Sequence, residues 1–173
     1  WYGSEKVGDN GSYDPVNSGM YWRWYPIQNP IPNKFGDGKM ACINFPTVVA
    51  ALTLYNNVPT DRKEAVGKDR GYLSKLQYLQ RGKEIYEWGM ENLFDKQTGC
   101  VADSRHGDGK PAWKAHVYNQ ATFIGASVLL YKTTGNKYYL DNAILATDYV
   151  VNEMSADHGV LPFEDGIEQG IYT

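Results

Sequence analysis

The chain has 173 residues and a formal net charge of −3, and 14% of its residues are aromatic, including 14 Tyr and 5 Trp. Its Lys and Arg residues do not cluster, which excludes the usual pattern of proteins that bind nucleic acid or an anionic membrane surface. The mean hydropathy is −0.52, and no apolar run approaches the roughly 20 residues that span a bilayer. We therefore expect no nucleic-acid partner and no membrane-spanning segment.

The first part of the chain, from Trp1 to Asp37, is predicted to be an ordered loop. It is rich in Gly, Pro, Asn and Ser, and its prolines disfavour helix in the residues before them. The aromatic run from Tyr21 to Tyr25 would leave too much apolar surface in water if this part were disordered.

Four helices are predicted after this loop, over residues 44–56, 73–94, 120–134 and 137–154. The first and third are apolar on nearly every side, which is typical of helices buried among neighbours. The second and fourth have one apolar face and one charged face, which predicts outer helices. The expected order is therefore inner, outer, inner, outer, as in a barrel of antiparallel helical hairpins.

The two hairpins repeat in detail. Asn44 precedes Tyr55 by eleven residues, and Gln120 precedes Tyr131 by the same number. Four helices cannot close such a barrel, and the chain opens on Trp1 with no signal-peptide pattern. We therefore interpret residues 1–173 as one incomplete domain, truncated at both ends.

Polar side chains are predicted to meet at one end of these hairpins. In an antiparallel hairpin the first helix begins where the second one ends, so the loop over 100–117 joins the starts of both inner helices. The residues gathered on this rim are Asn44, Asp103, Arg105, Trp113, Tyr118, Asn119 and Gln120. Amides, a carboxylate and aromatic rings in one place suit a sugar, which has hydroxyl groups and flat C–H faces.

Each rim residue also has an ordinary structural explanation. Asn44 and Gln120 are interpreted either as helix caps or as ligand contacts, and Asp103 either as a ligand or as a turn residue. Trp22 and Trp24 are interpreted either as platforms for a sugar or as parts of the core. The same geometry brings Cys42 near Cys100, so a free pair and a disulfide both stay open.

Other chemistries have little support in the sequence. The three histidines, His106, His116 and His158, are scattered, and no Gly-rich phosphate loop occurs, so we expect neither a metal nor a cofactor. Glycoside hydrolysis usually needs two carboxyl groups about 5–10 Å apart. Glu164 and Asp165 are adjacent and their side chains are expected to point apart, so no catalytic residue is assigned in this chain.

Four segments resemble a known family. They are Trp22-Arg23-Trp24-Tyr25, Ala41-Cys42-Ile43-Asn44-Phe45-Pro46, the stretch from Glu91 to Gly99, and Tyr118-Asn119-Gln120 with Phe123-Ile124-Gly125-Ala126. Together they resemble glycoside hydrolase family 76, the endo-α-1,6-mannanases, with this chain covering the middle-to-late part of the domain.

The resemblance implies an all-α fold, part of an (α/α)6 barrel, and hydrolysis of α-1,6-linked mannan with retention. It also implies an Asp-Asp pair as nucleophile and acid/base, and no two consecutive aspartates occur in this chain. The pair is expected upstream. The binding roles that carry over fall only on Asp103, Tyr118, Asn119, Asn44 and Gln120. Trp24 is a candidate stacking residue because of its aromatic ring, and not because of the resemblance. We expect a monomer that is secreted, periplasmic or bound to the cell surface.

Two rival functions fit the same residues. A non-catalytic glycan-binding relative would look identical over this part of the domain. Another (α/α)6 enzyme acting on sugars, such as an epimerase, would use histidines as acid and base, and the three histidines here are poorly spaced for that role.

Overall fold

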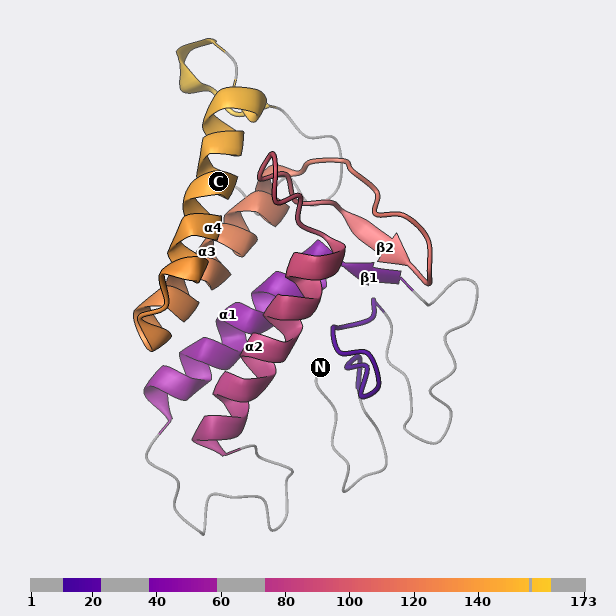
Figure 1. The fold of residues 1–173 in the computed structure, drawn as a ribbon, viewed down its shortest axis with the longest axis vertical. Coiled ribbons are helices and arrows are strands. Elements are labelled where there is room, and N and C mark those ends of the chain that lie inside the picture. The colour runs from indigo at the N-terminus through magenta and orange to yellow at the C-terminus, as the bar shows by residue number, and fades with distance from the viewer. Residues whose placement is uncertain (1–10, 23–37, 59–73, 156, 163–173) are drawn as a thin grey trace.

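The computed structural model describes residues 11–22, 38–58, 74–155 and 157–162 (Figure 1). These residues form the helices α1 (Ala41–Asn57), α2 (Lys75–Asn92), α3 (Val117–Thr134) and α4 (Lys137–Tyr149), followed by the π-helical turn η2 (Val150–Met154) and the 3-10 turn η3 (Asp157–Gly159). Two short strands, β1 (Gly38–Met40) and β2 (Ser104–His106), were not predicted. All four predicted helices are present.

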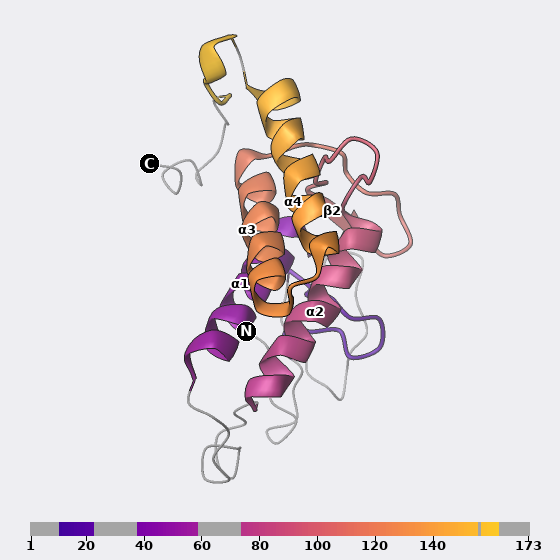
Figure 2. The same ribbon diagram turned by 60° about the vertical axis from the view of Figure 1, so that its left-hand side comes forward.

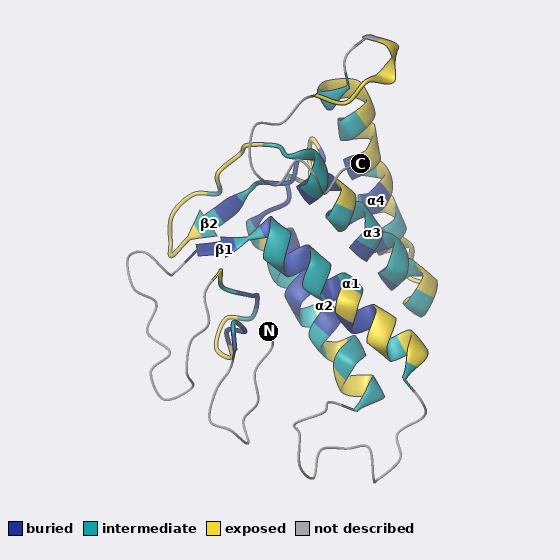
Figure 3. Ribbon diagram, turned by 180° about the vertical axis from the view of Figure 1, so that it is seen from behind, coloured by how far each residue is buried: buried dark blue, intermediate teal, exposed yellow. Residues whose placement is uncertain are grey.

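Helices α1 and α3 occupy the inner positions of the two hairpins. Helix α1 packs against both α2 and α3, and α3 packs against both α1 and α4 (Figures 1 and 2). Buried residues concentrate where the helices face one another, and the exposed residues of α4 lie on its outward side (Figure 3). The predicted order of inner and outer helices is confirmed.

Both inner helices begin three residues earlier than predicted. Met40 is the N-cap residue of α1 and His116 is that of α3, so Asn44 and Gln120 are each the fourth residue of their helix and cap neither one. Strand β1 leads straight into α1, and the backbone N–H of Ala41 donates to the carbonyl of Asp103. This hydrogen bond joins segments far apart in the sequence at the start of α1. The helical periodicity of the sequence could not predict it.

The outer helices begin and end by local rules. Helix α2 starts at a capping box, in which Ser74 and Gln77 bond to each other's backbone N–H groups. Helix α4 begins after Asn136, whose side chain accepts from Tyr138 N–H. The predicted helix over 137–154 is helical along its whole length. Its last five residues, from Val150, form π-helical turns.

Five aromatic rings form the centre of the core. Phe123 of α3 lies 4.4 Å from Phe94, 5.0 Å from Phe45 and 5.7 Å from Tyr86, measured between ring centroids. Tyr139 of α4 meets Tyr86 edge to face at 5.2 Å. Burial raises the pKa of Tyr86 well above its ordinary value, so its hydroxyl stays neutral beside Ser127, 2.8 Å away. Much of the aromatic content therefore serves packing between helices.

Gly82 and Gly89 of α2 both face α1. We expect replacement by Ala to change the stability of the protein in opposite directions at the two positions. A Cβ atom on Gly89 would lie 2.6 Å from Cε1 of Phe45, whereas one on Gly82 would meet the Cβ of Ala51 at an ordinary 3.5 Å. Gly89→Ala should lower the free energy of unfolding by about 1–3 kcal/mol, because the buried Phe45 ring has little room to move. Gly82→Ala should raise it by up to about 1 kcal/mol, because Ala favours helix. Urea denaturation of both variants checks this, and a loss of equal size in each would contradict the packing described.

Candidate functional site

The start of α1, the loop after α2 and the start of α3 meet at one end of the hairpins. Strands β1 and β2 pair antiparallel, with Met40 opposite Ser104 and Gly38 opposite His106. The backbone of Ala41 bonds to that of Asp103 at 2.9 Å, and Nδ2 of Asn119 donates to Oδ1 of Asp103 at 3.2 Å. The expectation that these three segments share one end of the molecule is therefore confirmed.

Asp103 presents its carboxylate at this end. Its side chain is 27% exposed, and Nε2 of His116 lies 3.9 Å from Oδ1. The Tyr118 ring stacks on the His116 ring at 5.2 Å between centroids. The cluster therefore combines a partly exposed carboxylate with an aromatic surface.

Asn119 is fully buried, and its two amide atoms differ in their environment. Nδ2 bonds to Asp103, whereas Oδ1 has no hydrogen-bond partner among the described residues. A buried acceptor without a donor costs about 1–3 kcal/mol. This oxygen can therefore accept from a hydroxyl group brought by a ligand or from a donor elsewhere in the protein.

Asn44 and Gln120, by contrast, use their amides to hold the protein's own loops. Both are fully buried. Oδ1 of Asn44 accepts from Met20 N–H at 2.7 Å, and its Nδ2 donates to the carbonyls of Met20 and Met40. The interpretation of Asn44 as a helix cap is wrong, because the side chain lies inside the helix and crosses to a neighbouring loop.

Gln120 repeats this arrangement one hairpin later. Its Oε1 accepts from Val101 N–H, and its Nε2 donates to the carbonyls of Gly99 and Ala146 at 3.1 and 3.3 Å. The cap interpretation of Gln120 is wrong for the same reason. The amides of Asn44 and Gln120 are both buried and hydrogen-bonded to backbone groups of neighbouring loops. Their polar atoms are therefore used inside the protein and do not face this end of the molecule.

The clamped loops are themselves equivalent turns. Oδ1 of Asp14 accepts from the N–H groups of Val16 and Asn17, and Oδ1 of Asp95 accepts from those of Gln97 and Thr98. Each turn ends at a glycine with positive φ, Gly19 at 79° and Gly99 at 85°. In the sequence this pattern is an aromatic residue and an aspartate followed by a glycine: Tyr13-Asp14 with Gly19, and Phe94-Asp95 with Gly99. The two turns were not predicted.

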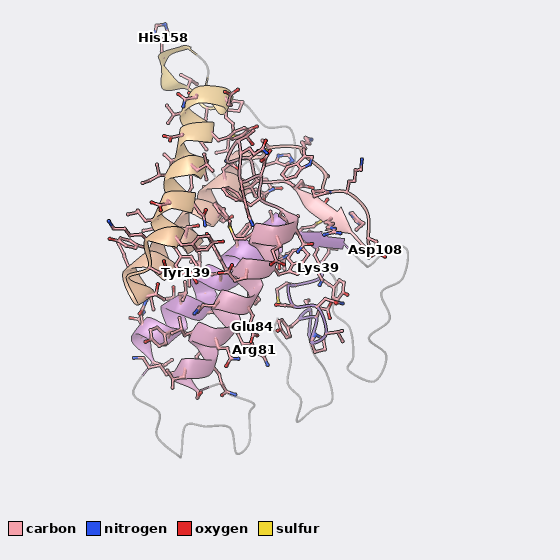
Figure 4. All side chains as sticks on the ribbon, in the orientation of Figure 1. Lys39, Arg81, Glu84, Asp108, Tyr139 and His158 are labelled. Carbon is pink, nitrogen blue, oxygen red and sulfur yellow. The ribbon has the colours of Figure 1, made fainter. Side chains whose placement is uncertain are left out.

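A polar cavity of about 460 Å³ lies between the turn that contains Asp14, the strands β1 and β2, and α2. Lys39 of β1, which Figure 4 labels, lines this cavity. Its Nζ lies 2.8 Å from Oδ2 of Asp14 and 4.7 and 4.8 Å from the ring centroids of Tyr21 and Trp88. Burial alone would raise the pKa of Asp14, but hydrogen bonds from Lys39 and two backbone N–H groups outweigh burial and lower it. Burial lowers the pKa of Lys39, and the bond to Asp14 offsets part of that shift. The groups that line this cavity therefore largely satisfy one another.

The other candidates contribute less to this end of the molecule. Trp24 and the Glu164–Asp165 pair lie outside the described residues. Trp22 is 49% exposed and Trp113 is 51% exposed, so neither belongs to the core. Cys42 and Cys100 are not joined in a disulfide, and burial raises the pKa of the Cys100 thiol. Within the described ranges, no three potential metal ligands come together.

The length and apolar character of the helices decide whether any of them could span a membrane. Across the described part of the chain, no helix is both long enough and apolar enough to cross a bilayer.

The sequence profile of glycosyl hydrolase family 76 matches residues 11–172. The chain belongs to glycosyl hydrolase family 76. The α-1,6-mannanase of Salegentibacter sp. HEL1_6, solved as an inactive variant in complex with α-1,6-mannotetrose, is 29% identical to this chain, with a TM-score of 0.68. The match covers 93% of this chain and 42% of that one. Among curated proteins, none is similar enough in sequence to count as a relative.

Two more distant structures show the fold alone. A Listeria innocua protein is 24% identical, with a TM-score of 0.67 over 92% of this family 76 chain and 40% of its own length. The cellobiose 2-epimerase of Spirochaeta thermophila is 18% identical, with a TM-score of 0.66 over 87% of this chain and 33% of its own. The helices described here therefore belong to an (α/α)6 barrel, as predicted. The chain spans 33–42% of the length of these three structures.

Proposed function

We propose that the intact protein is a glycoside hydrolase that cleaves α-1,6-linked mannan with retention, and that Asp103, Tyr118 and Asn119 bind the sugar. The observation that carries the proposal is the family 76 match over residues 11–172, together with structural similarity to α-1,6-mannanases at 28–29% identity.

The geometry at the rim supports a role in binding a neutral sugar. The partly exposed carboxylate of Asp103 can accept a hydroxyl hydrogen bond, which is stronger when the acceptor is charged. Oδ1 of Asn119 has no hydrogen-bond donor among the described residues, so it can accept one from a sugar hydroxyl. The ring of Tyr118 offers a flat face of the kind on which the C–H face of a hexose can stack.

The reacting carboxyl groups are proposed to lie outside this chain. Retaining hydrolysis needs one carboxylate as nucleophile and one carboxylic acid that protonates the leaving oxygen. The chain holds no two consecutive aspartates, and the Salegentibacter mannanase is described as inactive when two consecutive aspartates are replaced. In this proposal the described residues orient the glycan, while a pair elsewhere in the domain breaks the bond.

The direct experiment incubates the intact protein with linear α-1,6-mannan in the presence of a chelator and follows the release of short oligosaccharides by chromatography. We expect release without added metal, and no release from β-1,4-mannan. The 173-residue chain alone should show no turnover. Absence of release from α-1,6-mannan by the intact protein would overturn the proposal.

A second candidate function is glycan binding without catalysis, and the arrangement of Asp103, Tyr118 and Asn119 fits it equally well. Isothermal titration with an α-1,6-mannooligosaccharide separates the two, because a pure binding protein would retain the ligand uncut. An epimerase is less well supported, since the similarity to the epimerase concerns the fold alone.

The place of action is proposed to be outside the cytoplasm, in the periplasm, at the cell surface or in the medium, where a large polysaccharide is accessible. Immunodetection of the intact protein in fractionated cells tests this, and confinement to the cytoplasm would contradict it.

A further inference from the structure

Two basic side chains occupy opposite positions on the two strands, and both line the polar cavity. Lys39 of β1 is paired with Arg105 of β2. Like charges directly opposite each other in an antiparallel pair are destabilising. Lys39 is only 6% exposed, and its burial and the charge of Arg105 lower its pKa, although hydrogen bonding to Asp14 acts in the opposite direction. An anion in the cavity would reduce this repulsion.

Arg105 carries a positive charge that no neighbouring carboxylate balances. Its Nε donates to the carbonyl of Gly109 at 2.9 Å, and a terminal nitrogen donates to Oδ1 of Asn92. Both acceptors are neutral, and within the described ranges no carboxylate forms an ion pair with the guanidinium group. That group has five N–H donors, so three of them are not used by these two bonds. Because arginine forms paired hydrogen bonds with carboxylate and phosphate groups, Arg105 is suited to anchor an anion.

The buried groups beside Arg105 have their acceptors occupied. The two oxygens of Asp14 accept from backbone N–H groups of its turn, from the Tyr21 hydroxyl and from Lys39. Lys39 also donates to the carbonyl of Ser18 at 2.5 Å and lies over two aromatic rings. Lys39 therefore adds charge to the buried side of the cavity, and the unused donors counted above belong to Arg105. This side suits a ligand group that is anionic and rich in acceptors.

The exposed side of the cavity has a different character. Asn17 and Asp108 line the cavity and are both exposed, and Figure 4 labels Asp108 as well as Lys39. A carboxylate and an amide oxygen accept hydrogen bonds from hydroxyl groups. Water and salt screen the repulsion between the exposed Asp108 and an anion on the buried side. The volume, about 460 Å³, falls within the range of about 300–1,000 Å³ that is typical of small-molecule sites, so the cavity has room for more than a lone anion.

We propose that the cavity binds a sugar that carries a phosphate or carboxylate group. Arg105 holds the anionic group beside the charge of Lys39, and Asp108 accepts from sugar hydroxyls on the exposed side. The inference goes beyond the proposed function, because α-1,6-mannan is a neutral glycan. It depends on the cavity and not on the residues proposed to bind mannan.

The first test titrates the intact protein, by calorimetry, with three sugars that differ at one carbon: glucose 6-phosphate, glucuronate and glucose. We expect at least one of the two anionic sugars to bind about tenfold or more tightly than glucose, and the tighter of the two identifies the anionic group. Added salt should weaken this binding, because ions screen the attraction. A smaller difference from glucose, or no binding of either anion, overturns the inference. Cleavage of neutral mannan is measured separately, so that result leaves the proposed function intact.

The second test locates the bound anion. Arg105→Gln should weaken its binding about 10- to 100-fold, the scale of hydrogen bonds to a charged group. Lys132→Gln is the matched control, because it makes the same change of charge at an exposed position in the last turn of α3, outside the cavity, and it should bind like the parent. Circular dichroism checks that each variant is folded.

Arg105→Lys keeps the charge and loses the paired hydrogen bonds, so its affinity should lie between those of the parent and Arg105→Gln. A folded Arg105→Gln that binds the anion as tightly as the parent overturns the inference, and so does an equal loss in Lys132→Gln. If Arg105→Gln does not fold, Arg105→Lys decides, and parental affinity in that variant overturns the assignment of Arg105.

Discussion

Replacing Gln120 with Ala is expected to lower the free energy of unfolding by about 3–5 kcal/mol. The side chain makes three hydrogen bonds, to Val101, Gly99 and Ala146, and it is fully buried. Its removal leaves the N–H of Val101 in the interior without a partner and opens a cavity between α3 and the turn over 94–101. Denaturant unfolding followed by circular dichroism measures the loss.

Gln80→Ala is the matched control for this variant. Gln80 is an exposed glutamine of α2 whose side chain bonds only to Glu84 in the described structure, so its loss should cost less than about 0.5 kcal/mol. Asn44→Ala should behave like Gln120→Ala, since its amide holds the earlier turn in the same way. A Gln120 variant that keeps full stability and loses only glycan binding would restore the interpretation of Gln120 as a ligand residue.

Asp103→Asn is expected to lower kcat/KM of the intact enzyme on α-1,6-mannooligosaccharides by about 10- to 100-fold. The change removes a charged acceptor, and hydrogen bonds to charged groups contribute about 1.5–3 kcal/mol. It keeps an oxygen that can still accept from Asn119, so the fold should be preserved. Steady-state kinetics checks the effect.

Asp95→Asn is an unsuitable control, because the Asp95 carboxylate accepts backbone hydrogen bonds in its own turn. The matched control is Asp141→Asn, because the side chain of Asp141 is exposed on α4 and lies away from the rim. It should leave kcat/KM within twofold of the parent, as expected for a surface change. An Asp103 variant with the parent's kcat/KM would remove Asp103 from the sugar site.

The inner and outer helices could be predicted because their signal is local. Helix α1 is apolar on all sides and α2 is not, so periodicity alone assigned them their places. The equal spacing of Asn44 to Tyr55 and Gln120 to Tyr131 identified the two hairpins as repeats. The structure extends that equivalence to the hydrogen bonds of the two amides.

The roles of these amides could not be predicted, because they depend on contacts between distant segments. Strand β1, which pairs with β2, leads directly into α1 at Ala41, so Asn44 lies inside the helix, where its buried amide meets Met20 of a distant loop. The neighbours Asn119 and Gln120 then point to different places: one meets Asp103 near the surface, and the other reaches the turn at Gly99. The buried pair of Lys39 and Asp14 was missed for the same reason, since 25 residues separate the two side chains.

The most direct test of the central claim is the structure of the intact protein, with its proposed Asp-Asp pair silenced, bound to α-1,6-mannotetraose. We expect a mannosyl hydroxyl within about 3 Å of a carboxylate oxygen of Asp103, with the ligand also in contact with Tyr118. A tetrasaccharide bound elsewhere, with Asp103 contacted only by protein and water, would contradict it.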